Sequence, residues 1–416
     1  MRKSIVTVLA AGVALSLAAC SGAGTPATTP AAEPTTAATA GAGDTAAPAA
    51  GSLTIWVDET RIDNFQTIGE DFVTASGVAL DVVQKPTADI KTDFVAQAPT
   101  GEGPDLIVGA HDWTGELVSN GLISPIELGD KGKLADNAIA AFQYDGALYG
   151  VPYAVENIAL VRNNKIVQDT PDTFDALIEQ AKGAGAEFPA IIQVGDAGDA
   201  YHMYPIQTSF GAPVFKSNAD GSYTNELGME GAEGEAFATY LKKLADEKVA
   251  SVSMGGDQAK QAFLDGKSPY MITGPWNTAA FTEAGMDISV LAVPSAGGQP
   301  SAPFLGVQGV YLSSKSENGI LANQFLDYMA TTEAQQKLFD LGGRVPADTS
   351  VADGITDELL AGFAEAGKDG QPMPSIPEMG AVWSHWGNTE VSIINGQAAD
   401  PVAAWKTMAE NIKAGF

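Results

Sequence analysis

The chain has 416 residues, of which 51 are acidic and 22 basic, so its formal net charge is −29. A negative field of this size repels phosphate backbones, and we therefore expect no nucleic acid among its partners. Hydrophobic residues make up 45% of the sequence, enough for a large core, and the length allows two lobes or domains. Cys20 is the only cysteine, which excludes a disulfide framework and a thiolate metal site.

The N-terminal residues are typical of a secretory signal peptide. Arg2 and Lys3 precede an apolar run that is too short to span a bilayer, and small residues follow it up to Cys20. The leader resembles a bacterial lipoprotein signal, in which the peptide is cut just before the cysteine and the thiol is lipidated. This implies removal of residues 1–19, a change in net charge from −29 to −31, and a protein tethered outside the cell on the membrane.

Residues 21–52 consist mainly of Ala, Gly, Thr, Pro and Ser, with Glu33 and Asp44 as the only charges. Such a segment cannot bury enough apolar surface to fold, so residues 20–52 are predicted to be a lipid anchor and flexible linker. A coil of that length reaches roughly 30 Å.

Strands and helices are predicted to alternate from residue 53 onward. The alternation comprises strands at 53–57, 78–82 and 106–108, with helices marked by Phe65, Ile68 and Phe72 and then by Ile90 and Phe94. This order favours a parallel sheet with helices on both faces. Ligands bind such sheets beyond the carboxyl ends of the strands, so the residues that follow each strand matter most.

Helical spacing returns farther along the chain. Pro171 is a favourable first-turn residue for a helix over 174–181, and a second helix is predicted over 320–329. Thr332 and Gln335 fit a capping box for a third helix, which Gly342-Gly343 would end. Asp400-Pro401 then opens a last helix.

Five segments, in order along the chain, resemble the maltose/maltodextrin-binding proteins of bacteria. The matching segments are 101–112, 149–156, 273–276, 299–307 and 373–379, with Trp383 four residues beyond the last. The resemblance implies an α/β fold of the periplasmic-binding-protein type, with two α/β lobes, a ligand cleft between them and a chain that crosses the hinge three times. It places lobe 1 at 53–154 and 305–351, and lobe 2 at 155–304 and 352–416.

The resemblance also implies the residues that bind a sugar. Flat apolar platforms stack on sugar rings, and planar polar groups bind several hydroxyls at once. The aromatic candidates are Trp113, Tyr201, Trp276 and Trp383, and the polar candidates are Arg61, Asp112, Glu156 and Asp199. No cofactor is implied, and the three widely separated histidines lack metal-ligand spacing.

The sequence departs from the family pattern at four positions. Gly109 replaces a platform tryptophan, Trp113 replaces an arginine, Thr60 replaces an acid and Gly387 replaces an arginine. Trp113 can partly restore the platform lost at Gly109, or that subsite is open, and Trp386 is a candidate for a further face. These departures concern which sugar binds more than whether a sugar binds.

The resemblance implies a monomeric substrate-binding lipoprotein of an ABC importer, which captures α-linked glucose oligosaccharides and delivers them to the membrane permease by hinge closure. Receptors for trehalose, β-linked or galactose-containing sugars are the alternatives. A secreted glycoside hydrolase using Asp112 and Glu156 is another, because paired carboxylates beside tryptophans occur in both classes. A lipid-anchored adhesin would have no use for cleft tryptophans.

Overall fold

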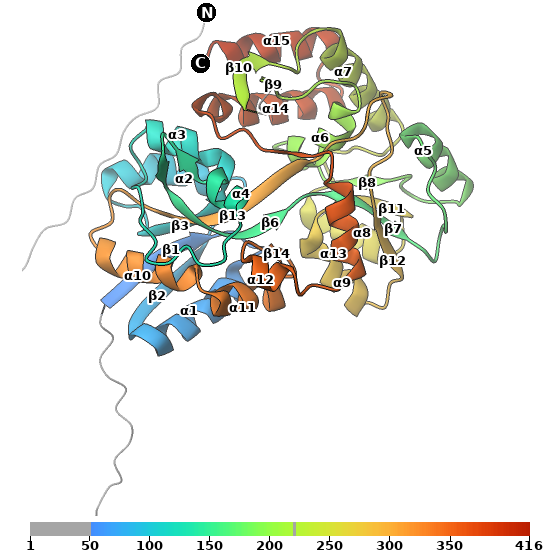
Figure 1. Ribbon diagram of the computed structural model, residues 1–416. Helices are drawn as coiled ribbons and strands as arrows, with labels where there is room; N and C mark the ends of the chain where they lie inside the picture. The colour runs from blue at the N-terminus through green and yellow to red at the C-terminus, as the bar shows by residue number, and fades with distance from the viewer. Residues whose placement is uncertain (1–50, 219–221) are drawn as a thin grey trace, which may run out of the picture. The chain divides into compact units, whose positions relative to one another are not determined.

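The predicted strands at 53–57, 78–82 and 106–108 lie together in the larger of two main β-sheets (Figure 1). The computed structural model describes residues 51–218 and 222–416, all within the unit from Ala47 to Phe416; Cys20 and most of the predicted linker lie outside the described residues. In spatial order the sheet contains β14 (Val345–Pro346), β6 (Gly150–Glu156), β13 (Phe304–Leu312), β3 (Leu106–Ala110), β1 (Gly51–Val57) and β2 (Val78–Gln84), and β15 (Gln371–Pro372) pairs with β13.

The three strands predicted to be parallel are parallel, but the larger sheet as a whole is mixed. Strand β1 runs parallel to β2 and β3, as predicted, but β13 is antiparallel to both β3 and β6. The reason is that β13 arrives from the other sheet rather than through a crossover helix on this one. Because β3 and β6 are both antiparallel to β13, they point the same way, and the carboxyl ends of β1, β3 and β6 share one edge.

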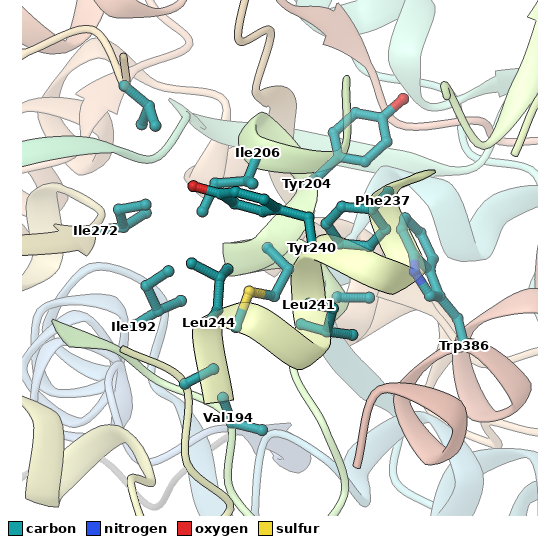
Figure 2. Close-up of a cluster of buried hydrophobic side chains, with 14 of the residues drawn as sticks. Ile192, Val194, Tyr204, Ile206, Phe237, Tyr240, Leu241, Leu244, Ile272 and Trp386 are labelled. Atoms are coloured by element: carbon teal, nitrogen blue, oxygen red, sulfur yellow. The ribbon is translucent and has the colours of Figure 1, made fainter. Parts of the chain in front are cut away.

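The smaller sheet has the order β12 (Ile288–Leu291), β7 (Ala159–Asn163), β11 (Tyr270–Thr273) and β8 (Ile191–Ile192). Successive side chains of a strand point to opposite faces, and both faces are apolar here. Leu160 and Ile272 join a core cluster with Phe237, Leu241 and Trp386, whereas their neighbours join a second cluster on the other face. Figure 2 shows the first cluster.

The helices cover both sheets. Those whose apolar side chains pack on the larger sheet are α1 (Ile62–Ser76), α2 (Ile90–Gln97), α3 (Thr114–Ser119), α4 (Asp136–Ala141), α10 (Gly319–Met329) and α11 (Thr332–Gly342). Those on one face of the smaller sheet are α5 (Phe174–Gly183), α6 (Ala200–Thr208), α7 (Gly231–Asp246), α14 (Val382–Ile394) and α15 (Pro401–Lys413). Those on its other face are α8 (Gly256–Leu264), α9 (Thr278–Glu283) and α13 (Glu358–Ala366). The remaining short elements are α12 (Thr349–Ala352), the pairs β4 (Gln143–Tyr144) with β5 (Ala147–Leu148) and β9 (Phe215–Ser217) with β10 (Tyr223–Leu227), and the 3₁₀ segments η1 (Ala98–Thr100), η2 (His111–Trp113), η3 (Pro275–Asn277) and η4 (Pro377–Ala381).

Two predicted helix starts need correction. Thr331, not Thr332, caps α11, because its hydroxyl accepts a hydrogen bond from the Ala334 N–H. Gln335 is fully buried and donates to the Pro152 carbonyl instead of closing a capping box. Thr173 caps α5, which leaves Pro171 outside the helix.

The chain passes between the sheets at three places. Asn157 and Ile158 connect β6 directly to β7, and the segment after β12 leads back into β13. After β14 and α12 the chain reaches α13, which packs on β12. The Asn157 side chain also donates to the Phe363 carbonyl of α13 at 3.0 Å, so two of the passages contact each other. The architecture is the two-lobed α/β fold that the sequence predicts, while the exact lobe boundaries stay a prediction.

Within residues 51–218 and 222–416, none of the helices combines the length and the apolar character that a membrane crossing requires.

Candidate functional site

Three acidic side chains mark the shared edge of the larger sheet. Asp58 follows β1, Asp112 lies two residues after β3, and Glu156 is the last residue of β6. All three are at most 5% exposed. Buried carboxylates are costly unless they are paired or hydrogen-bonded, so each of them needs partners at this edge.

Glu156 is surrounded by donors. Its Oε1 accepts hydrogen bonds from Arg61 Nη2 at 3.2 Å and Gln308 Nε2 at 2.9 Å, and its Oε2 accepts one from Arg344 Nε at 2.9 Å. Arg61 also pairs with Asp58. Two arginines and two acids therefore form a neutral, buried cluster at the end of β6.

The electrostatics of this cluster are balanced by direct contacts. Burial opposes the charge of Asp58, yet the Arg61 guanidinium and hydrogen bonds from Thr60 hold the pKa of Asp58 below its ordinary value. Burial likewise opposes the charge of Arg61, but Asp58, Tyr153 and Glu156 raise its pKa well above the ordinary value. The two acids and the two arginines are paired with each other, so a neutral ligand fits the cluster better than an anion would.

Asp112 lies in a different environment. Trp383 Nε1 donates to its Oδ2 at 2.8 Å, while Oδ1 is buried with no hydrogen-bond partner among the described residues. Burial raises the pKa of Asp112 to about 6, although Lys91 and the Trp383 bond lower it in part. Oδ1 therefore has lone pairs for a hydroxyl, but a ligand reaches this buried atom only if the surrounding side chains move.

His111 fixes the position of Asp112. Its Nδ1 accepts the Val307 N–H at 3.1 Å and its Nε2 donates to the Met373 carbonyl at 3.0 Å. Burial lowers the pKa of His111 to about 4, so the ring is neutral and structural. Asp112 is thereby tied to β13 and to the segment after β15.

Two tryptophans of the site fold back over glycines. A Cβ on Gly274 would lie 2.0 Å from Trp276 Cζ3, and a Cβ on Gly109 would lie 2.2 Å from Trp113 Cζ3. Both indoles are half-buried and follow the ends of β11 and β3. Trp113 therefore fills the space beside Gly109, and that position is not left open.

The other aromatic candidates join the site through ring contacts. Tyr201 stacks on Phe304 with ring centroids 6.4 Å apart, and Trp383 meets the same Phe304 edge-on at 6.0 Å. A Cβ on Gly306 would lie 3.5 Å from both the Tyr201 hydroxyl and the Glu156 carbonyl oxygen, so Tyr201 lies near the charged cluster.

Trp386 does not supply a further face, and that prediction is wrong. It is fully buried, stacks on Trp383 at 5.6 Å and donates its indole N–H to Gln207 Oε1 at 3.1 Å. Figure 2 shows it in the core beside Phe237. Residues three apart on a helix share a face, so Trp386 supports Trp383 from behind.

Asp199 hydrogen-bonds to a histidine, which in turn contacts a tryptophan of the site. It caps α6 by accepting the His202 N–H, and its Oδ1 also lies 2.9 Å from His202 Nδ1. The His202 ring meets Trp276 at 5.9 Å. The Asp199 loop reaches this place because Gly387 has no side chain: a Cβ there would lie 2.5 Å from the Ala197 carbonyl.

The structure thus brings the predicted residues into one region. Arg61 contacts Glu156 directly, Asp112 contacts Trp383 directly, and Asp199 reaches Trp276 through one histidine. Sequence reasoning missed the polar residues Asp58, His202, Gln308 and Arg344. Asp58 could have been found, since it directly follows a predicted strand; Arg344 follows a helix-ending glycine pair and carries no such signal.

In the described part of the chain, no three His, Cys, Asp or Glu side chains gather as metal ligands. The site is instead built from hydrogen-bonding groups and aromatic faces.

A sequence profile described as "Bacterial extracellular solute-binding protein" matches residues 67–368, well over half of the chain. This chain belongs to the bacterial extracellular solute-binding protein family. A solute-binding relative from Streptococcus pneumoniae R6, named as a maltooligosaccharide ABC transporter solute-binding lipoprotein, is 27% identical over 85% of this chain and 86% of its own length. A galactooligosaccharide-binding protein from Bacillus subtilis 168 is 26% identical over 99% of this chain and 97% of its own.

This solute-binding protein shares its fold with a protein of known structure. The Thermus thermophilus maltotriose-binding protein, solved with maltotriose bound, matches with a TM-score of 0.79 and 29% identity. The match covers 87% of this chain and 99% of the other.

Proposed function

We propose that this protein is the substrate-binding lipoprotein of an ABC sugar importer and that it binds maltose or maltodextrin-type α-glucosides. The observation that carries the proposal is the site itself, where the half-buried Trp276 and Trp383 lie beside a neutral cluster of paired charges and the free Asp112 Oδ1. Apolar platforms with hydrogen-bonding groups suit the faces and the hydroxyls of a sugar. The likeness to a maltotriose-bound structure supports this class of ligand.

The residues proposed to form the sugar site are the aromatics Trp113, Tyr201, Trp276 and Trp383 and the polar residues Arg61, Asp112, Glu156 and Asp199. The proposed lobes are 53–154 with 305–351, and 155–304 with 352–416. Binding between them would close the hinge at the three chain passages, and the closed form would dock on the permease.

A galacto-oligosaccharide is the second candidate ligand, because the relative of that name covers nearly the whole chain at similar identity. Trehalose and β-linked sugars have no comparable support. A hydrolase is disfavoured, because it needs a working pair of carboxylates, and three donors, two of them arginines, already hold Glu156.

We further propose that Cys20 carries a lipid that holds the monomeric receptor at the outer face of the cell membrane. The name of the Streptococcus relative supports a lipoprotein. Mass spectrometry of protein from the native host tests the modification.

The sugar is tested by titrating tryptophan fluorescence with maltose, maltotriose, trehalose, raffinose and a galacto-oligosaccharide. We expect maltotriose to bind with a Kd on the order of 1 μM, about −8 kcal/mol. If the fluorescence does not change with maltotriose but changes with the galacto-oligosaccharide, the second candidate ligand replaces the first. Release of glucose or maltose from maltotriose by pure protein would overturn the receptor role.

A further inference from the structure

Arg344 is a buried arginine at the meeting point of the two lobes. It directly follows Gly343, which ends α11 in the left-handed conformation (φ +62°), and it precedes β14. Val345 pairs with Val155, so Arg344 is brought beside the end of β6. It is 5% exposed.

Two edges of the Arg344 guanidinium are fixed on the larger sheet. Its Nε donates to Glu156 Oε2 at 2.9 Å, and its Nη2 donates to Thr60 Oγ1 at 3.0 Å. A guanidinium is planar and presents five N–H donors in a rigid fork, so two such bonds determine the orientation of the whole group.

The guanidinium also faces the other lobe. Its central carbon lies 5.9 Å from the Trp276 ring centroid, within the range of a cation–π contact. Trp276 follows β11 of the smaller sheet and is held at two further points, against Gly274 and near the His202 ring. Arg344 therefore joins a carboxylate of one lobe to an aromatic ring of the other.

We propose that Arg344 is a positioning residue for the sugar site, which orients the Trp276 indole relative to the Glu156 cluster. This inference rests on the proposed function for its effect on binding, whereas the contact with the indole does not. A lysine keeps the charge but has a single nitrogen, which cannot hold Glu156, Thr60 and the ring at once. Lysine at this position therefore restores the role only in part.

The first experiment needs no sugar. The chain has six tryptophans, so labelling with 5-fluorotryptophan gives one ¹⁹F resonance for each, and Trp276→Phe identifies the resonance of Trp276. We expect Arg344→Met to shift that resonance and Arg344→Lys to shift it less. Lys243→Met is the control, because Lys243 on α7 lies 5.2 Å from the Tyr240 ring and 2.7 Å from Asp175 on α5. A Trp276 resonance that stays in place in Arg344→Met overturns the inference.

The second experiment measures maltotriose affinity in a double-mutant cycle. We expect about a tenfold or larger loss for Arg344→Met, a loss of about threefold for Arg344→Lys, and none for Lys243→Met. The double variant Arg344→Met/Trp276→Phe should bind within about twofold of Trp276→Phe alone. Wild-type affinity in Arg344→Met, or single losses that multiply in the double variant, would show that Arg344 does not act through Trp276.

The two proposals fail in different ways. Wild-type protein that binds none of the sugars refutes the proposed function, while the ¹⁹F shifts still decide whether Arg344 orients the indole. If Arg344→Met does not fold, the same measurements are made with Arg344→Lys, alone and in a double-mutant cycle with Trp276→Phe.

Discussion

Asp112 offers a measurable link between the site and the stability of the fold. Burial raises its pKa from 3.8 to about 6, while Lys91 and the hydrogen bond from Trp383 to Oδ2 lower it only in part. One pKa unit corresponds to 1.36 kcal/mol, so the folded state favours the protonated form by about 3 kcal/mol. Because the folded pKa is the higher one, this contribution is complete below about pH 4 and is lost as the pH rises through 6.

Asp112→Asn keeps the shape and removes the titration. We expect the free energy of unfolding of the variant, relative to wild type, to rise by about 3 kcal/mol between pH 4 and pH 8. Urea unfolding followed by circular dichroism at several pH values measures it. The control is Asp58→Asn, whose carboxyl has a lowered pKa beside Arg61, so its stability relative to wild type should stay nearly constant between pH 4 and pH 8 and change only at lower pH. A stability difference for Asp112→Asn that does not change with pH would refute the assignment.

Three further predictions concern neighbouring positions. Trp276→Ala should weaken sugar binding more than tenfold and leave the fold intact, as circular dichroism can check; equal affinity would remove Trp276 from the site. Gly109→Ala should cost about 1–3 kcal/mol, because the new methyl meets the Trp113 ring at 2.2 Å, whereas Gly319→Ala, with open space around it, should cost nothing. Glu390 is fully buried, and burial raises its pKa well above the ordinary value, so stability falls at high pH. Glu390→Gln should therefore be about 1–3 kcal/mol more stable than wild type at pH 8 and equal to it at pH 4, as urea unfolding can check; equal stability at both pH values would contradict it.

Much of this arrangement could be predicted from local sequence patterns. The rule that ligands meet the carboxyl ends of strands directs attention to Asp112 and Glu156, and both lie at that edge. The Gly-Pro pair before Trp276 predicts an indole presented from a turn, and it lies half-buried in a short 3₁₀ segment over 275–277. These features depend on residues close together in the chain, which is why the sequence carries them.

The missed features depend on contacts between distant segments. Arg344 hydrogen-bonds to Glu156, which lies 188 residues away in the chain. Nothing in the local sequence distinguishes Trp386 from Trp383, although Trp386 is fully buried and Trp383 is half-buried. Strand β13 reads as an ordinary apolar strand, and only its entry from the other lobe makes it antiparallel. Local propensity cannot report such contacts, because they follow from how the two sheets are joined.

Glu156 already accepts three hydrogen bonds, which bears on how a sugar would be recognised. Three donors already occupy its two oxygens, so a hydroxyl can bind Glu156 only by displacing Arg61, Gln308 or Arg344 or by sharing an oxygen with them. Displacement would leave a buried charge unpaired, which costs about 1–3 kcal/mol or more. The direct acceptor is therefore better sought at Asp112 Oδ1, and Glu156 is better understood as the group that orders the two arginines. On this view Glu156→Gln weakens binding chiefly by disordering Arg61 and Arg344, while Asp112→Asn removes a sugar contact itself.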